Sequence, residues 1–225
     1  MKFIILFQGR TGSSYLTESI NSYPGIVMLP EILGGEAQKA TPKHVALQIK
    51  KLNKVFRKDN TGFKAKLADV LDHKALTAYI KDNDIKIIYM VRKNLIKLAI
   101  SVINGRRLFK ETGLWNLENA QDRLPPFRVD LPELDHVLTV RERQEEELRE
   151  FVAGLPTTIE VEYEDLLHNE KQTLKKLYTF LGVPFVHTKG TTYKNTDDDI
   201  SKAILNYEEV VSRYKGTKYE EMVRI

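Results

Sequence analysis

The first residues able to do chemistry form the run Gln8–Tyr15, which reads Gln-Gly-Arg-Thr-Gly-Ser-Ser-Tyr and lies between a short apolar segment and one with helical spacing. Its two glycines let the backbone turn tightly, and the free N–H groups and positive dipole end of a helix start favour an anion. Ser13 and Ser14 add hydroxyl donors, and Arg10 adds a charged, forked donor. We therefore predict a phosphate or sulfate cradle. The simpler alternative is a glycine-rich turn whose serine caps the helix.

Two features separate this run from a Walker A phosphate loop. In that loop a Lys and a Ser or Thr follow the last glycine, whereas Gly12 is followed by serine and the cation, Arg10, comes two residues earlier. Nucleotide hydrolases and kinases of that class also end a second strand in an acid that helps to hold the metal. The corresponding apolar run here, 85–91, ends in Arg92 and Lys93. Because two cations repel magnesium, we expect a second phosphate at this point and no metal site.

Regular elements must hold these residues in place. Short β-branched runs predict four strands, at residues 3–7, 62–65, 85–91 and 157–161. Segments with helical spacing lie between and after them, at 13–22, 42–56, 76–82, 94–106, 131–153 and 171–181. Strands that alternate with helices are typical of a doubly wound α/β fold. We predict a three-layer fold of the P-loop type, with a central parallel sheet flanked by helices.

The composition is that of an ordinary globular protein. The 225 residues carry a formal charge of +4, with 42% hydrophobic and 29% charged residues, which excludes disordered, collagen-like and coiled-coil chains. This length suits a single domain, spanning 1–225. The irregular stretch 104–130, with Trp115 and two adjacent prolines, is expected to be a lid or a substrate-binding insertion. The absence of cysteine excludes disulfides and thiolate metal sites.

Charge and hydropathy also restrict the partners. The basic excess is small and evenly spread, so it is compatible with an anionic ligand but does not indicate nucleic acid. The first apolar run, Phe3–Phe7, is too short for a signal peptide, and no segment approaches a transmembrane length. We therefore expect a soluble, cytoplasmic protein. Nothing in the sequence indicates its oligomeric state.

The loop and the strand-end cations together resemble the sulfotransferases that use 3′-phosphoadenosine 5′-phosphosulfate (PAPS), in particular the bacterial, carbohydrate and tyrosyl-protein branches. The resemblance implies that the loop holds the 5′-phosphosulfate and that Arg10 stabilises the leaving phosphate. It also implies that Arg92 and Ser101 hold the 3′-phosphate. The family separates the last two residues by eight positions and this chain by nine, so Lys93 is an alternative to Arg92. The loop residues implied in cofactor binding are Arg10, Thr11, Gly12, Ser13, Ser14 and Tyr15.

Two later segments add to the resemblance. Val161–Leu167, followed by a helix and the run Phe180–Pro184, is similar to the segment that closes the cofactor site in the family. This similarity implies that Tyr163 lies near the adenine. Lys194 lies where the family places a late basic loop against the 3′-phosphate.

Sulfuryl transfer needs donors for the bridging oxygen and a base for the acceptor hydroxyl. Lys64, at a predicted strand end, is a candidate donor, the alternative being an ordinary surface lysine. The candidate base is Glu31, which a turn and a short apolar run carry back towards the loop and which matches the Glu base of the bacterial and tyrosyl-protein branches. Glu31 is otherwise a capping or exposed carboxylate, and Glu36 is the reserve. The cytosolic enzymes use a histidine, but His44 and His73 are both expected at the surface.

The resemblance therefore predicts a PAPS-dependent sulfotransferase that moves the sulfuryl group in line to an acceptor hydroxyl without a metal, leaving 3′-phosphoadenosine 5′-phosphate (PAP). The acceptor is expected to be a sugar, a lipid or another small molecule. Two alternatives stay open. One is a P-loop kinase-like phosphotransferase, and the other is a non-catalytic nucleotide-binding or interaction module.

Overall fold

The computed structural model describes residues 1–34, 40–117 and 119–224. The chain separates into two compact units, which we describe in turn. The sheet unit comprises Met1–Val91 and Glu145–Thr191, and the helical unit comprises Arg92–Gln144 and Thr192–Ile225. None of the helices in the described ranges has the length and apolar character needed to cross a bilayer.

The sheet unit is built on five parallel strands in the order β2-β3-β1-β4-β5, which confirms the predicted α/β fold with a central parallel sheet. The four predicted strands are present, each within one residue of its expected ends. The fifth, β2, was not predicted, because it is only three residues long and lies at the sheet edge. The strands are β1 Lys2–Phe7, β2 Val27–Leu29, β3 Thr61–Ala65, β4 Lys86–Val91 and β5 Thr158–Glu162.

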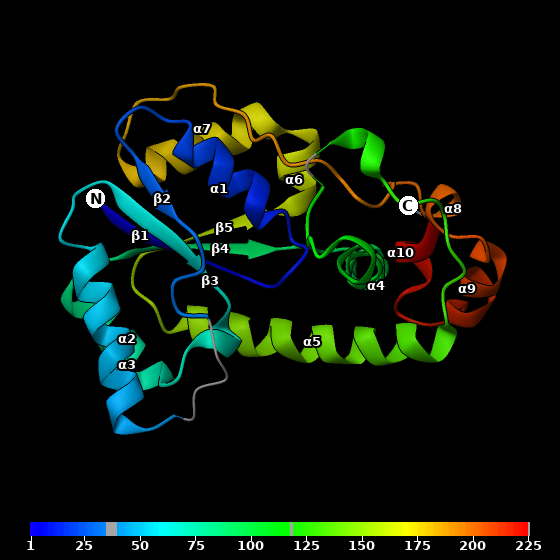
Figure 1. Cartoon of the computed structure of the whole chain (residues 1–225), viewed down its shortest axis with the longest axis horizontal. Coiled ribbons are helices and arrows are strands. Elements are labelled where there is room, and N and C mark those ends of the chain that lie inside the picture. The colour runs from blue at the N-terminus through cyan, green and yellow to red at the C-terminus, as the bar shows by residue number, and fades with distance from the viewer. Residues whose placement is uncertain (35–39, 118, 225) are drawn as a thin grey trace. The chain divides into compact units, whose positions relative to one another are not determined.

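Helices cover both faces of the sheet (Figure 1). Successive side chains of a strand point to opposite faces. Phe3 and Ile5 of β1 therefore pack under α1 and α7, whereas Ile4 and Leu6 pack against α2, α3 and the last turns of α5. The helices of this unit are α1 Ser13–Asn21, α2 Pro42–Val55, α3 His73–Asp82, α6 Tyr163–His168, α7 Glu170–Leu181 and the end of α5 Leu131–Ala153.

The spacing of β3 from β1 depends on a glycine. A side chain at Gly62 would place its Cβ 2.4 Å from Cε2 of Phe3, so only glycine leaves room for the phenyl ring that lies over it on this face of the sheet. The register pairs Ile5 with Lys64 and Leu6 with Ala65. Because paired residues of neighbouring strands share a face, Lys64 points to the same side of the sheet as Ile5, towards α1.

The helical unit is formed around α4, Leu95–Thr112, which packs with the beginning of α5 and with α8 Ile200–Ala203, α9 Tyr207–Tyr214 and α10 Glu220–Arg224. The expectation of an irregular stretch from residue 104 is wrong for 104–112, which continue α4. That helix ends where Gly113 adopts a left-handed conformation with φ of 75°. The single domain and the role of 104–130 as a lid stay predictions.

Candidate active site

The loop between β1 and α1 has an unusual backbone. Arg10 has a φ of 74° and Gly12 a φ of 81°, so two nearly adjacent residues lie in the left-handed region, which is strained for arginine. The hydroxyl of Thr11 is fully buried and donates to the carbonyl of Gln8 at 2.7 Å, which fixes the turn from inside. Left-handed residues of this kind orient successive N–H groups towards an anion.

The first turn of α1 lacks a side-chain cap. Its N-cap residue is Gly12, which excludes the alternative in which a serine caps the helix. The first N–H groups of a helix have no partner within the helix, and the helix dipole makes this end attractive to anions. Ser13 and Ser14 are the first two residues of this helix. The loop therefore has the geometry predicted for a phosphate or sulfate cradle.

Lys64 reaches the phosphate loop from the end of β3. Its Nζ donates to Oγ of Ser14 at 3.0 Å, and its side chain is only 15% exposed. Lys64 thus lies beside the loop and is mostly shielded from solvent, and its role as a donor to the bridging oxygen stays a prediction. Burial lowers the pKa of Lys64, while the nearby Glu31 carboxylate opposes that shift.

Glu31 belongs to the same cluster. Its Oε2 lies 2.7 Å from Nζ of Lys66, and its Oε1 lies 3.9 Å from Nζ of Lys64. The carboxylate therefore forms an ion pair instead of serving as a helix cap or an isolated surface group. Burial raises the pKa of Asp69, and the nearby Lys66 opposes that shift. Sequence reasoning did not single out Lys66 or Asp69, although Lys66 follows Lys64 by two positions, just beyond the end of β3.

Tyr163 packs directly on the loop. A Cβ at Gly12 would lie 2.8 Å from Cδ2 of Tyr163, so the ring and the glycine are in close contact. The ring comes from the first residue of α6, immediately after β5. The structure thus brings Tyr163 to the loop, and its position near the adenine stays a prediction.

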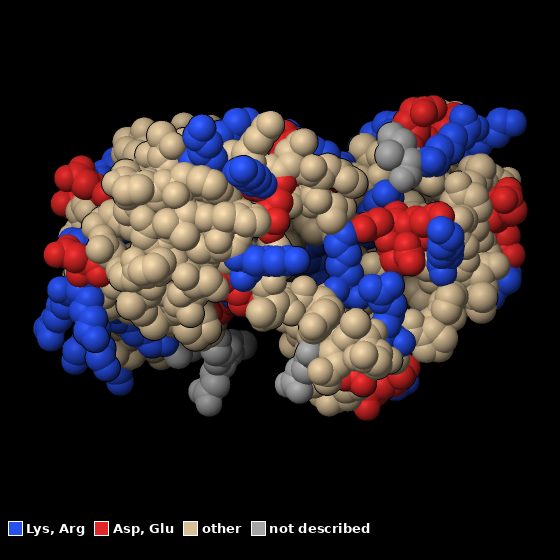
Figure 2. Space-filling model, turned by 90° about the horizontal axis from the view of Figure 1, so that it is seen from above, with Lys and Arg blue, Asp and Glu red and all other residues tan. Residues whose placement is uncertain are grey.

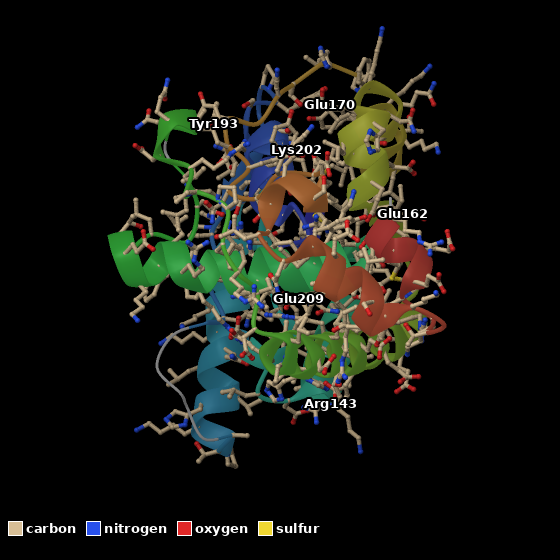
Figure 3. All side chains as sticks on the ribbon, turned by 90° about the vertical axis from the view of Figure 1, so that its right-hand side faces the viewer. Arg143, Glu162, Glu170, Tyr193, Lys202 and Glu209 are labelled. Carbon is tan, nitrogen blue, oxygen red and sulfur yellow. The ribbon has the colours of Figure 1, made fainter. Side chains whose placement is uncertain are left out.

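Tyr15, on the first turn of α1, is held from two sides. Its hydroxyl donates to Glu170 at the start of α7, which is labelled in Figure 3. A Cβ at Gly190 would lie 2.6 Å from the Tyr15 carbonyl oxygen, so a later loop crosses α1 at close range. That loop is also fixed by Thr191, whose N–H and hydroxyl donate to Oε2 of Glu18 at 2.7 and 3.0 Å. The side chain of Tyr15 therefore braces α1.

A buried polar network supports the base of the loop. Nε2 of Gln8 donates to Oε2 of Glu145 at 2.6 Å, and the hydroxyl of Tyr89 donates to the other carboxylate oxygen. Burial raises the pKa of Glu145, although both hydrogen bonds favour its ionised form. The three residues come from β4, α5 and the residue after β1, and no spacing in the sequence connects them.

The remaining predicted residues belong to the helical unit. Arg92 is 7% exposed and Ser101, on α4, is 5% exposed, whereas Lys93 is exposed. The ammonium of Lys194 pairs with the Asp198 carboxylate. The backbone carbonyl of Lys194 accepts a hydrogen bond from Nε of Arg123 at 3.1 Å. An anion at Lys194 would compete with the Asp198 carboxylate.

The reserve candidates for the base are less informative. Glu36 lies outside the described residues. His44 lies in the first turn of α2, where its N–H donates to Oγ1 of Thr41, and His73 is exposed at the start of α3 with its ring on Phe151. In the described part of the chain, His, Asp and Glu side chains form no group of three that could hold a metal ion.

Comparison with known proteins identifies the fold. No protein-family model and no curated protein sequence matches the chain. A sulfotransferase from Alicyclobacillus acidocaldarius is similar in structure, with a TM-score of 0.51, 14% identity and coverage of 99% of this chain and 95% of that one. The mouse sulfotransferase SULT7A1 complexed with PAP gives a TM-score of 0.47, 19% identity and coverage of 94% and 66%. The sulfotransferase domain from the curacin biosynthetic pathway gives a TM-score of 0.46 and 17% identity, with coverage of 82% of this chain and 75% of that one.

These likenesses concern the fold. The bacterial protein resembles this chain in fold over almost the whole length of both chains. The chain spans just under two thirds of the length of the mouse protein.

Proposed function

We propose that this protein is a PAPS-dependent sulfotransferase of the type found in the bacterial, carbohydrate and tyrosyl-protein branches. One observation carries the proposal: an uncapped helix start, a buried cation and a carboxylate form one connected cluster. The contacts run from Ser14 through Lys64 to Glu31. An anion site next to a cation and a candidate base suits transfer of an anionic group to a hydroxyl.

The resemblance implies donor-binding residues in each of the two units. The donor, when bound, supplies the sulfuryl group and the phosphate that leaves with its bridging oxygen. The loop backbone, Arg10 and the Ser13 and Ser14 hydroxyls would bind the 5′ end, and Tyr163 would contact the adenine. The 3′-phosphate would be bound by Arg92, Ser101 and Lys194. Arg92 is preferred to Lys93 because a guanidinium shielded from solvent binds phosphate more strongly than an exposed ammonium.

In the proposed reaction the acceptor oxygen forms a bond to sulfur while the bond between sulfur and the bridging oxygen breaks. Glu31 takes the proton of the acceptor hydroxyl. Lys64 and Arg10 neutralise the charge that develops on the bridging oxygen, and fixed donors of this kind need no reorganisation during the reaction. Lys66 holds the Glu31 carboxylate through their 2.7 Å ion pair and so acts as a positioning residue.

Calorimetric titration of the purified protein tests the donor site. We expect PAP to bind at least about tenfold more tightly than AMP, because a phosphate contact by charged donors contributes on the order of 1.5–3 kcal/mol. Equal affinities would contradict the 3′-phosphate assignment. Transfer from labelled PAPS should also continue in the presence of a metal chelator, whereas chelator-sensitive transfer from ATP would support the kinase alternative.

A further inference from the structure

The outward face of α2 carries a row of cations. Positions 43, 47, 50 and 54 lie nearly in line on a helix with 3.6 residues per turn, and 51 lies beside them. They are lysines except for Leu47, and α2 contains no Asp or Glu. Two more cations follow the end of the helix. We call these exposed residues the basic stripe: Lys43, Lys50, Lys51, Lys54, Arg57 and Lys58.

The stripe works against the stability of its own helix. Lys50 and Lys54 are four residues apart, a spacing at which like charges repel. Lys43 lies in the first turn, where the positive end of the helix dipole disfavours a cation. Among the described residues, no ion pair joins these three lysines to a carboxylate. A bound polyanion would remove the repulsion.

The stripe is fixed next to the candidate base. Gln48, on the inner side of α2, is buried, and its amide donates to the carbonyls of Asp69 at 2.7 Å and Leu33 at 3.3 Å. Nζ of Lys51 donates to the carbonyl of Ile32 at 3.3 Å, one residue beyond Glu31. The stripe therefore begins beside the segment that holds the Glu31 carboxylate. Figure 2 shows Lys and Arg side chains gathered at the left-hand end of the molecule, where Figure 1 places α2 and α3.

We infer that the basic stripe binds an anionic oligosaccharide, bearing carboxylate or sulfate groups along its length, and that this chain is the sulfuryl acceptor. The inference rests on the proposed function. Lys43 and Lys54 are separated by about 16 Å at 1.5 Å per residue, a span that suits a chain of several sugars. Such a chain presents both the charges that the lysines need and the hydroxyls that a Glu31 base needs.

Other polyanions suit this surface less well. A helix that lies in a membrane interface presents a broad apolar face to the lipid. The large apolar side chain exposed along the stripe is Leu47, at 43%. Single-stranded nucleic acid is bound by aromatic side chains on which bases stack. The cations of the stripe are interleaved with no Phe, Tyr or Trp that the structure describes as exposed.

Calorimetric titration with an octamer of galacturonic acid tests the inference, and the methyl-esterified octamer serves as the uncharged control. The variant Lys43→Glu/Lys50→Glu/Lys54→Glu reverses three charges of the stripe and leaves Lys51 in place. We expect it to bind the octamer at least about tenfold more weakly than the wild-type protein, because three attractive charge contacts become repulsive ones. The esterified octamer should bind neither protein.

The matched control reverses three exposed lysines of α7, Lys171, Lys175 and Lys176, which changes the net charge equally on another helix of the same unit. This control should retain octamer affinity within about twofold, and both variants should bind PAP like the wild-type protein. An equal loss of octamer binding in both variants would contradict the assignment of the basic stripe as the binding site. Tighter binding of phosphatidylserine vesicles or duplex DNA than of the octamer would overturn the choice of partner. Octamer binding without PAP binding would instead sink the proposed function, and with it the acceptor role.

Discussion

The two units hold their predicted site residues in different ways. In the sheet unit, Ser14, Lys64 and Glu31 come from three separate segments and meet in one chain of contacts. In the helical unit, Arg92 is buried three residues before the start of α4, while Lys194 is paired with Asp198. A parallel sheet brings the ends of its strands to one edge, so residues at strand ends meet whatever connects them. Residues on helices and late loops have no such common edge, and each must find its own partner.

The largest effect is expected at Glu31. Glu31→Gln keeps the size and polarity of the side chain but removes its ability to take a proton, so kcat should fall by on the order of 10²–10⁴-fold. PAP affinity should stay within about threefold of wild type, since the role proposed for the carboxylate is towards the acceptor and not the nucleotide. Steady-state kinetics and calorimetry give the two values. Glu150→Gln, an exposed acid on α5, is the control. Near-normal turnover in Glu31→Gln would move the base elsewhere.

The variant Arg10→Gly distinguishes the effect of the Arg10 side chain from the effect of its left-handed backbone. Glycine adopts a positive φ without strain, so the free energy of unfolding should stay within about 1 kcal/mol of wild type. Loss of the guanidinium should lower the transfer rate by about 10²–10³-fold, as removal of one preorganised donor does. Thermal unfolding and kinetics measure the two effects. Full activity in Arg10→Gly would show that the loop backbone suffices.

Arg92 and Lys93, the two neighbouring cations after β4, allow the proposed 3′-phosphate contact of the helical unit to be tested. Arg92→Ala should weaken PAP by on the order of 10–100-fold and leave AMP almost unchanged, because only PAP carries the 3′-phosphate. Lys93→Ala, one residue away and exposed, is the matched control and should change the PAP-to-AMP ratio less than about threefold. The ratio is informative even if Arg92→Ala lowers stability. The reverse pattern would assign the phosphate to Lys93.

Two glycines of the loop should differ in tolerance. At Gly12 an added Cβ meets the Tyr163 ring and φ is positive, so Gly12→Ala should lower the free energy of unfolding by about 1–3 kcal/mol. At Gly9 an added Cβ meets no atom within 4 Å, so Gly9→Ala should change the free energy of unfolding by less than about 1 kcal/mol. Urea unfolding monitored by circular dichroism compares them. Equal tolerance would contradict the close contact between Tyr163 and the loop.

The smallest effect concerns pH. Burial lowers the pKa of Lys64, so as pH rises its ammonium loses the proton at a lower pH than an ordinary lysine does. A reaction that needs the cation is fastest below that pKa and falls above it. Lys64→Arg keeps its charge throughout, so the alkaline decline of kcat should move to higher pH. Profiles between about pH 7 and 11 measure it, and an unchanged decline would remove Lys64 from the reaction.

Much of the fold could be predicted because buried parallel strands read as short apolar runs. Residues 3–7 and 85–91 are clear examples, and both are buried on two faces. The strand β2 could not be found in this way, since it is three residues long and Val27 is 46% exposed. The end of α4 was predicted at residue 106, too early, since the helix continues to Thr112 and Gly113 is the glycine that ends it.

The site was predictable where one motif or one strand end carried it. The loop around Arg10 could be named because strand, turn and helix follow each other in sequence. Lys64 was named from its place at a strand end, and Glu31 from the short run that leads back to the loop and from the family resemblance. The support from Glu145 could not, since that residue lies on a long charged helix and reaches Gln8 only through tertiary packing. Pairings of this kind depend on how α5 meets the sheet, which no local pattern records.

The absence of a side chain at Gly62 has a consequence for how activity could be lost. Any larger residue there must displace the phenyl ring of Phe3 or move β3 away from β1. The ammonium group of Lys64, two positions further along β3, would move with the strand. A conservative change at an uncharged, inaccessible position would then abolish the proposed activity while every polar group of the site stayed in the sequence. Natural variants or engineered libraries that lose turnover with an intact set of charged residues should be inspected first at this position.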